Sequence, residues 1–313
     1  MAPFVSVILP VYNQEKYLQE TIQSILDQSF QQFELIILDD GSSDNSAHII
    51  SEFAGRDKRI RAYYNANVGK SISTNYLVSQ ALGEWCAFID ADDVMLPCRL
   101  QRQVELHTQS TEVDACSCNC YYINGQGNLF GTQRYNGLGT VTEYRTTIKR
   151  RKFITCSYTG LMVSKRAYID AGGLNPMYEP CEDFEFLNRF VEKGFVLLVI
   201  PEVLMKYRIH SSAVTIQKPI LVLDTIAFVK HNINLRRLGQ PEISFEAFSA
   251  IQNKYSWLIK FNKMRFNYSM IFFRSAGFAI LSKKYLAFTW KIATSLMLSP
   301  DYVLKKVWNH LRK

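Results

Sequence analysis

The stretch VSVILPVYNQEKYLQETIQSIL, residues 5–26, contains two hydrophobic periodicities in succession. Residues 5–9 form an almost continuous apolar run, which is typical of a strand buried on both faces. Beyond it, apolar residues recur with the spacing of one helix face, at Leu18, Ile22, Ile25 and Leu26. We expect Asn13 to cap this helix. The stretch therefore predicts a buried strand followed by an amphipathic helix.

The same alternation continues along the chain. Apolar runs predict further strands at residues 33–38, 60–64, 85–89, 114–123, 160–163, 195–200 and 205–208. Helices are predicted after a cap at 42–44, and at residues 71–81, 97–107 and 182–192. Residues 124–152 carry five glycines and predict a long loop or hairpin region. Apolar strands separated by helices of this length predict a mostly parallel sheet with helices on both faces, a Rossmann-like α/β fold.

The charge of the chain is unevenly distributed. Residues 241–313 contain twelve Lys or Arg and three Asp or Glu, a net charge of +9, whereas the 313-residue chain carries +8, so residues 1–240 sum to −1. We therefore expect an α/β domain over residues 1–218 and a basic, aromatic-rich helical extension over residues 219–313. Basic residues interrupt the extension before any run reaches the ~18 apolar residues of a membrane span.

Composition also bears on location and on partners. The N-terminus has no basic segment before its first strand, so we expect no signal peptide. Seven cysteines, an odd number, fit buried thiols in a reducing compartment, and the expected location is cytoplasmic. Nucleic acid is a poor partner for the extension, because its positive charges are interleaved with large apolar clusters and no nucleic-acid module is visible.

Ligands of parallel α/β sheets bind at the carboxyl ends of the strands. At one such end FIDADDV, residues 88–94, places Asp90, Asp92 and Asp93 within four positions. Carboxylates this close repel each other unless a cation or hydroxyl donors intervene, and oxygen ligands suit Mg²⁺ or Mn²⁺. The alternative is a solvated acidic turn in which Asp93 caps the following helix.

Three further groups are candidates for chemistry. Asp39, at the end of a predicted strand, is placed to accept a hydrogen bond from a base N–H. Asp183 in PCEDFEFLNRF, residues 180–190, is either a general base or an acid favoured by a helix N-terminus. Arg208 and His210 suit phosphate or metal contacts, although a lone histidine is more often structural.

Six segments in order resemble the glycosyltransferase family 2 pattern: VSVILPVYN, FELIILDDGSSDNS, NVGKSISTN, GEWCAFIDADD, CEDFEFLNR and YRIH. The resemblance covers about residues 4–212. It implies an inverting, metal-dependent nucleotide-sugar transferase of GT-A fold. A nucleotide-sugar half would span about residues 1–110 and an acceptor half about residues 111–218.

The resemblance also implies residue roles. Asp39 would bond the uracil ring of a UDP-sugar, Asp92 and His210 would hold Mn²⁺ or Mg²⁺, and Asp183 would be the general base. The residues expected to contact the nucleotide sugar are Pro10, Val11, Tyr12, Asp39, Asn67, Lys70, Asp90, Ala91, Asp92 and Arg208. Two positions depart from the pattern: Thr74 stands where many members have Arg, and Lys70 stands where the family usually has an apolar residue and could reach a phosphate.

The function implied is transfer of a sugar from a UDP-sugar to a hydroxyl of a glycan or glycolipid, in cell-surface polysaccharide synthesis. Two alternatives stay open: transfer to a polyprenyl phosphate, and a nucleotide-sugar-binding protein without turnover. For the extension, an anionic membrane surface on the cytoplasmic face, a second subunit in a homodimer and the α/β domain itself are the alternative partners.

Overall fold

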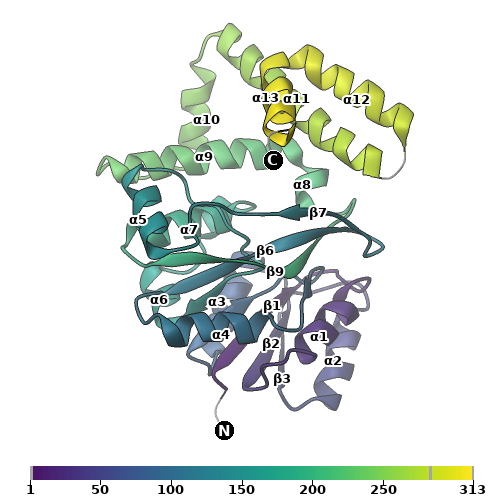
Figure 1. Ribbon diagram of the computed structural model, residues 1–313, viewed down its shortest axis with the longest axis vertical. Coiled ribbons are helices and arrows are strands. Elements are labelled where there is room, and N and C mark those ends of the chain that lie inside the picture. The colour runs from purple at the N-terminus through teal and green to yellow at the C-terminus, as the bar shows by residue number, and fades with distance from the viewer. Residues whose placement is uncertain (1–2, 282–283, 312–313) are drawn as a thin grey trace. The chain divides into compact units, whose positions relative to one another are not determined.

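The computed structural model of the protein describes residues 3–281 and 284–311. Its contacts divide the chain into two units, residues 1–213 and 214–313, whereas the sequence placed the boundary after residue 218. The first unit is an α/β unit and the second is helical (Figure 1).

The first unit is built on one sheet with the order β3-β2-β1-β4-β8-β6-β9-β5, and β7 pairs with β6. Neighbours along β3-β2-β1-β4 are parallel, as are β6 and β9, while β8 is antiparallel to both β4 and β6. The strands are β1 (Val5–Val11), β2 (Phe33–Asp39), β3 (Ile60–Tyr64), β4 (Trp85–Phe88), β5 (Val94–Met95), β6 (Ala115–Asn124), β7 (Leu129–Gln133), β8 (Met162–Ser164) and β9 (Leu197–Ile209).

Helices cover both faces of this sheet, as predicted (Figure 1). Along β1, Val7 and Leu9 face one apolar core while Ile8 faces the other, because successive side chains of a strand alternate. The first core is closed by α1 (Leu18–Leu26), α2 (Ser46–Arg56) and α4 (Arg99–Gln109). The second is closed by α3 (Lys70–Gln80), α5 (Val141–Lys149), α6 (Lys165–Ala171) and α7 (Glu182–Glu192).

The cap predicted at Asn13 is wrong, because α1 begins only at Leu18. Asn13 adopts a positive φ of 52°, and its side chain accepts a hydrogen bond from the Ser43 amide. The loop that precedes α1 is thus hydrogen-bonded to the loop that precedes α2. Residues 13–17 belong to the first of these loops and not to α1.

Several other elements differ from the sequence prediction, among them the short strand β5, which was not predicted. Residues 124–152 contain the hairpin strand β7 and a helix, α5, that was not predicted. Helix α6 was also missed, and the two strands predicted at residues 195–200 and 205–208 are one strand, β9, with a register shift against β6.

The second unit consists of helices, as the sequence predicted. They are α8 (Val214–Gln217), α9 (Pro219–Arg237), α10 (Phe245–Asn253), α11 (Trp257–Leu281), α12 (Tyr285–Leu298) and α13 (Pro300–Leu311). Helices α11 and α12 are joined by buried hydroxyls, since Ser269 Oγ donates to the Ser295 carbonyl at 2.8 Å. Within the ranges that the structure describes, no helix is both long and apolar enough to span a membrane.

A buried arginine, Arg99 at the start of α4, fixes the middle of the α/β sheet. Its guanidinium is fully buried and donates to the carbonyls of Phe88 (2.9 Å), Thr159 (2.9 Å) and Leu161 (3.1 Å). Its Nε donates to the Gln103 side chain at 3.0 Å. The Arg99 side chain thus donates hydrogen bonds to backbone carbonyls at the end of β4 and in the segment that leads into β8.

We predict that Arg99→Leu lowers the free energy of unfolding by about 3 kcal/mol, because several buried carbonyls lose a charged donor. Urea denaturation followed by circular dichroism measures the change. The control is Arg102→Leu on the same helix, whose exposed ion pair with Glu202 should matter little. Equal stability of the two variants would contradict the structural role of Arg99.

Candidate active site

The sequence-predicted site residues gather at the carboxyl edge of the parallel part of the sheet. Strands β2, β1 and β4 are neighbours, and Val11 at the end of β1 pairs with Asp39 at the end of β2. The chain leaves β4 at the same edge, and Asp90 is the second residue after that strand. Three loops that are distant in sequence therefore open side by side.

Asp39 and Asp40 follow β2 and have different surroundings. Both are buried, but Asp39 Oδ1 has no hydrogen-bond partner, whereas Asp40 accepts the amides of Val68 and Gly69, each at 3.0 Å. Asp40 thereby holds the loop before α3. Gly41 is required here, because its φ is +74° and a Cβ would lie 2.7 Å from the Asn67 nitrogen.

The residues predicted to line a base pocket are only partly open to solvent. Tyr12 is exposed and Pro10 is partly exposed, but the Val11 side chain lies in the core. Asn67 is exposed. Ala91 is buried, and its carbonyl accepts a hydrogen bond from Thr21 Oγ1 at 3.0 Å.

Asp90 and Asp92 each have a basic partner from a distant segment. Strand β4 ends at Phe88, so both residues lie in a loop rather than on an extended strand. Asp90 Oδ1 lies 2.6 Å from Lys70 Nζ, and its amide donates to Thr159 Oγ1 at 3.1 Å. Asp92 Oδ2 lies 2.7 Å from His210 Nε2.

Asp93 closes a turn, because its amide donates to the Asp90 carbonyl at 3.1 Å, but it is not a helix cap and is not solvated, which corrects that part of the sequence prediction. It is fully buried, and Oδ1 accepts the Arg208 amide at 2.8 Å, so it joins the acidic loop to β9. Burial raises the pKa of Asp93 well above its usual range, and the nearby carboxylates of Asp92 and Asp90 raise it further. The element that follows is the strand β5, not a helix.

Arg208 also differs from its expected role in phosphate binding. Its side chain is only 1% exposed, donates from Nε to the Asp92 carbonyl at 2.7 Å and pairs with Glu20 at 2.6 Å. The guanidinium lies over the Tyr17 ring, 4.6 Å from its centroid. The guanidinium of Arg208 is therefore bound to other groups of the protein. It stabilises the acidic loop, residues 89–93, through the Asp92 carbonyl.

His210 and Asp92 are the predicted metal ligands, and the structure brings them into direct contact. His210 Nδ1 faces Ser212 Oγ at 2.7 Å, which orients the ring. Among the residues described, no cluster of three or more His, Cys, Asp or Glu side chains is arranged to hold a metal ion. The Asp92–His210 pair therefore contains two side chains of metal-ligand type, one carboxylate and one imidazole.

Asp183, the predicted general base, is the second residue of α7 and interacts electrostatically with Lys70. Burial raises the pKa of Asp183, Lys70 opposes this, and Asp90 adds to it. Its neighbour Glu182 is buried with Oε2 unpartnered, and burial raises the pKa of Glu182 to about 7. The sequence singled out only Asp183 in this pair, although its motif contains both acids.

Several residues of the site were not predicted. Thr159, Glu20 and Glu179 reach it through hydrogen bonds with partners at least 69 positions away in the chain. No local pattern marks them, because their role depends on which loops the sheet order brings together.

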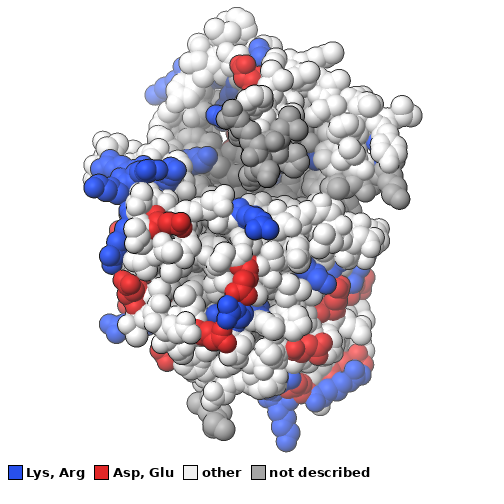
Figure 2. All heavy atoms as spheres, viewed as in Figure 1, with Lys and Arg blue, Asp and Glu red and all other residues white. Residues whose placement is uncertain are grey.

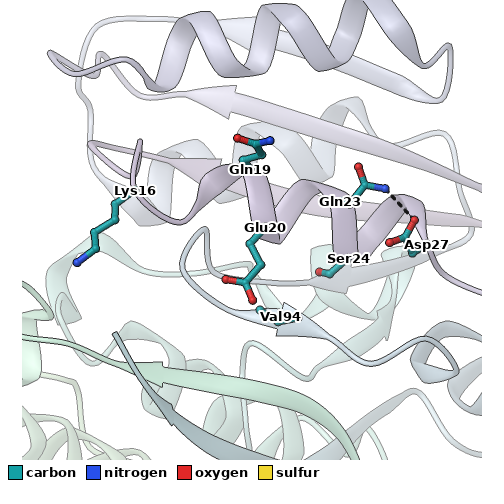
Figure 3. Close-up of a pocket in the computed structure, with 7 residues that line it drawn as sticks. All are labelled: Lys16, Gln19, Glu20, Gln23, Ser24, Asp27 and Val94. Atoms are coloured by element: carbon teal, nitrogen blue, oxygen red, sulfur yellow. Dashed lines mark hydrogen bonds between the residues drawn. The ribbon is translucent and has the colours of Figure 1, made fainter. Parts of the chain in front are cut away.

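An open polar hollow of about 520 Å³ lies along the outer side of α1 (Figure 3). It is lined by Lys16, Gln19, Glu20, Gln23, Ser24, Asp27 and Val94. None of the sequence-predicted site residues lines it. It borders the acidic segment through Val94, the residue after Asp93, and through Glu20, the partner of Arg208.

The chain is similar in sequence to known glycosyltransferases. The glycosyl transferase family 2 profile matches residues 6–170, more than half of the chain. An uncharacterized glycosyltransferase of Methanocaldococcus jannaschii is 31% identical over 67% of this chain and 72% of its own length. A GalNAc(5)-diNAcBac-PP-undecaprenol beta-1,3-glucosyltransferase of Campylobacter jejuni is 28% identical over 62% of each chain.

Among solved structures, residues 1–349 of S. aureus TarS in complex with UDP-GlcNAc share the fold. The TM-score is 0.58, with 17% identity over 95% of this chain and 91% of that chain.

We predict that Asp93→Ala lowers the free energy of unfolding by about 2 kcal/mol, since the buried Arg208 amide loses its acceptor. Asp93→Asn should keep the stability at pH 8 at or above that of the unmodified protein, because the amide oxygen still accepts and cannot ionise. Thermal unfolding of both variants measures the effects. Equal destabilisation by Asn and Ala would contradict this role.

Proposed function

The chain belongs to glycosyl transferase family 2, and on that premise we propose that it transfers a sugar from a UDP-sugar to a hydroxyl of a glycan or glycolipid. The proposal rests on one observation: Asp39 ends β2 at the sheet edge where Asp90 and Asp92 follow β4, and Asp90 interacts electrostatically with Asp183 of α7. Relatives named for teichuronic acid and undecaprenol-linked glycan synthesis support a role in cell-surface polysaccharide assembly.

The uridine preference rests on Asp39. Its buried Oδ1 lacks a protein partner, and leaving a buried acceptor unpaired costs free energy that a ligand N–H would recover. The exposed Tyr12 ring and the partly exposed Pro10 beside it offer apolar surface for a base. A structural neighbour bound to UDP-GlcNAc agrees with this choice of nucleotide.

The residues of the Asp92–His210 pair fit Mn²⁺ or Mg²⁺. A carboxylate and an imidazole lie within 2.7 Å of each other here, and both are groups that bind such cations. Such a cation, when bound, stabilises the negative charge that develops on the departing diphosphate. Asp92 and His210 would hold it, and the Arg208 contact with the Asp92 carbonyl steadies that loop.

Asp183 is the proposed general base. It would take the proton of the acceptor hydroxyl as that oxygen forms a bond to the anomeric carbon and the bond to UDP breaks. A single displacement of this kind inverts the configuration. The raised pKa of Asp183 makes its carboxylate a stronger base, and requires that it be ionised at the working pH.

Release of UDP over a panel of UDP-sugars, with and without Mn²⁺, tests the proposal. We expect hydrolysis or transfer with at least one donor, and a fall in kcat of ~10² or more for Asp183→Asn with unchanged UDP affinity. Asp170→Asn, a surface acid on α6, is the matched control and should keep full activity.

Two outcomes would favour other functions. Full activity of Asp183→Asn would favour an acceptor that is already anionic, such as a polyprenyl phosphate. Calorimetric UDP binding without turnover of any donor would favour a nucleotide-sugar-binding protein.

We also propose that the helical unit binds an anionic membrane surface. Its described residues expose large apolar side chains, among them Trp257 (76%), Leu286 (87%) and Met297 (82%). On α13 the exposed Leu304 and Trp308 flank Lys305 and Lys306. In Figure 2, Lys and Arg side chains gather over the end of α9, whose last turn contains Arg236 and Arg237. Lys283, Arg312 and Lys313, which were counted in its basic excess, lie outside the described residues.

Apolar side chains next to lysines suit the interface of an anionic bilayer, where each Lys near the surface adds about 1 kcal/mol. We predict that the full chain sediments with phosphatidylglycerol vesicles, is released by about 0.5 M salt, and does not bind phosphatidylcholine alone. Lys305→Glu with Lys306→Glu should weaken binding at least tenfold.

The matched control reverses two surface charges of the α/β unit, Lys58→Glu with Arg166→Glu. Recovery of every variant in the supernatant, or equal weakening by the two pairs, would contradict a membrane role for the helical unit. A concentration-dependent dimer in solution would instead assign the apolar surface to a second copy of the chain.

A further inference from the structure

Lys70 lies among carboxylates from two other segments of the α/β unit. Its Nζ is 2.6 Å from Asp90 Oδ1, after β4, and it interacts electrostatically with Glu182 and Asp183, in the first turn of α7. Lys70 itself is the first residue of α3. The side chain is 40% exposed and that of Asp90 is 31% exposed, so both groups are accessible to solvent.

The position of Lys70 is fixed by hydrogen bonds on both of its sides. The amides of Val68 and Gly69, just before it, donate to the Asp40 carboxylate. The amide of Ser71, just after it, donates to Glu179 Oε1 at 2.8 Å. Because Glu179 lies three residues before Glu182, this contact also ties the start of α3 to the segment that leads into α7.

The groups around Glu182 and Asp183 come from every neighbouring element, and most of them are acidic or neutral. They are Lys70 of α3, Asp90 after β4, Glu179 and Cys181 before α7, and Cys156 and Tyr158 before β8. Burial raises the pKa of both thiols to about 12, so they are neutral at physiological pH. Of these groups, only Lys70 carries a positive charge.

We propose that Lys70 is the shared counter-ion of Asp90, Glu182 and Asp183, a positioning residue that holds Asp183 in the ionised form needed to accept a proton. This inference rests on the proposed function, in which Asp183 is the base. It differs from a phosphate contact, the role expected from the sequence, because the ammonium already has a carboxylate partner at 2.6 Å.

The direction of the effect follows from the environment of the two acids. For both Asp183 and Glu182, burial raises the pKa and Lys70 is the largest opposing influence. A neighbouring opposite charge at a few ångströms favours the ionised form of a carboxyl group. Without Lys70, both carboxyls should bind their protons more tightly, and Asp183 should lose its capacity to act as a base near neutral pH.

The first test compares the pH dependence of kcat for Lys70→Met, Lys70→Arg and the unmodified protein, with the donor found in the UDP-release screen. In Lys70→Met the acidic limb should move up by about one pH unit, which lowers kcat about tenfold at pH values below that limb. At high pH, kcat should approach the unmodified value. Lys70→Arg should restore the profile, and Lys58→Met, at a surface position, should not change it.

A phosphate contact would give a different pattern. If Lys70 bound the diphosphate, Lys70→Met would raise KM and weaken UDP binding in calorimetry at every pH, with no shift of the acidic limb. That result would overturn the proposal.

The second test does not require turnover. A carboxyl whose pKa is higher in the folded protein than in the unfolded chain contributes stability at low pH that is lost as pH rises through the folded pKa. Lys70→Met raises these folded pKa values further, so its melting temperature should fall more steeply between pH 5.5 and pH 8.5 than that of the unmodified protein, a window set by the Glu182 pKa of about 7.

The double variant Lys70→Met with Asp183→Asn tests whether Asp183 causes the steeper pH dependence of the melting temperature. The additional slope should shrink when Asp183 can no longer ionise, because the two substitutions act on the same interaction. Parallel melting profiles for Lys70→Met and the unmodified protein would refute the counter-ion role. Absence of turnover with every donor would refute the proposed function alone, since the melting profiles would still decide the role of Lys70.

Discussion

Electrostatic repulsion among Asp90, Asp92 and Asp93 is the constraint on which the organisation of this site depends. Three carboxylates within four positions are compatible with a stable fold only if each has its own compensation. Asp90 pairs with Lys70, Asp92 contacts His210, and Asp93 accepts a backbone amide from β9 in a buried setting that favours its protonated form. The three aspartates are therefore chemically distinct despite their adjacency.

These compensations require segments from across the α/β unit to meet at one sheet edge. Lys70 comes from the third helix, while Arg208 and His210 come from the end of β9 and just beyond it. Arg99 holds the carbonyls of Phe88 and Thr159 beneath the loop, and Thr159 in turn accepts the Asp90 amide. The fold and the site are thus stabilised by the same contacts, because the loop that carries the acids is anchored at both ends by buried cations.

The sequence predicted what depends on local periodicity and on the ends of strands. Strands β1 to β4 followed from apolar runs, and Asp39, Asp90 and Asp92 were found because they end such runs. Helix α5 was missed, although Thr140 and Glu143 form the T-x-x-E pattern of a capping box and the Thr140 side chain accepts the Glu143 amide. The burial of Asp93 and Arg208 was not predictable, because each acquires its role from a partner more than a hundred positions away.

The arrangement separates two electrostatic environments within one short loop. In the proposed function, the imidazole and the carboxylate on the Asp92 side would hold a cation that stabilises the negative charge of a diphosphate. On the Asp90 side, a lysine offsets an acidic cluster that contains the proposed base. Displacement at an anomeric carbon needs these two properties at opposite ends of the reacting bond: stabilised negative charge where the nucleotide departs, and an ionised proton acceptor where the hydroxyl arrives. In the proposed function, a loop with acids at both positions would supply them because its two basic partners differ: a lysine, which stays charged, and a histidine, whose neutral form can bind metal.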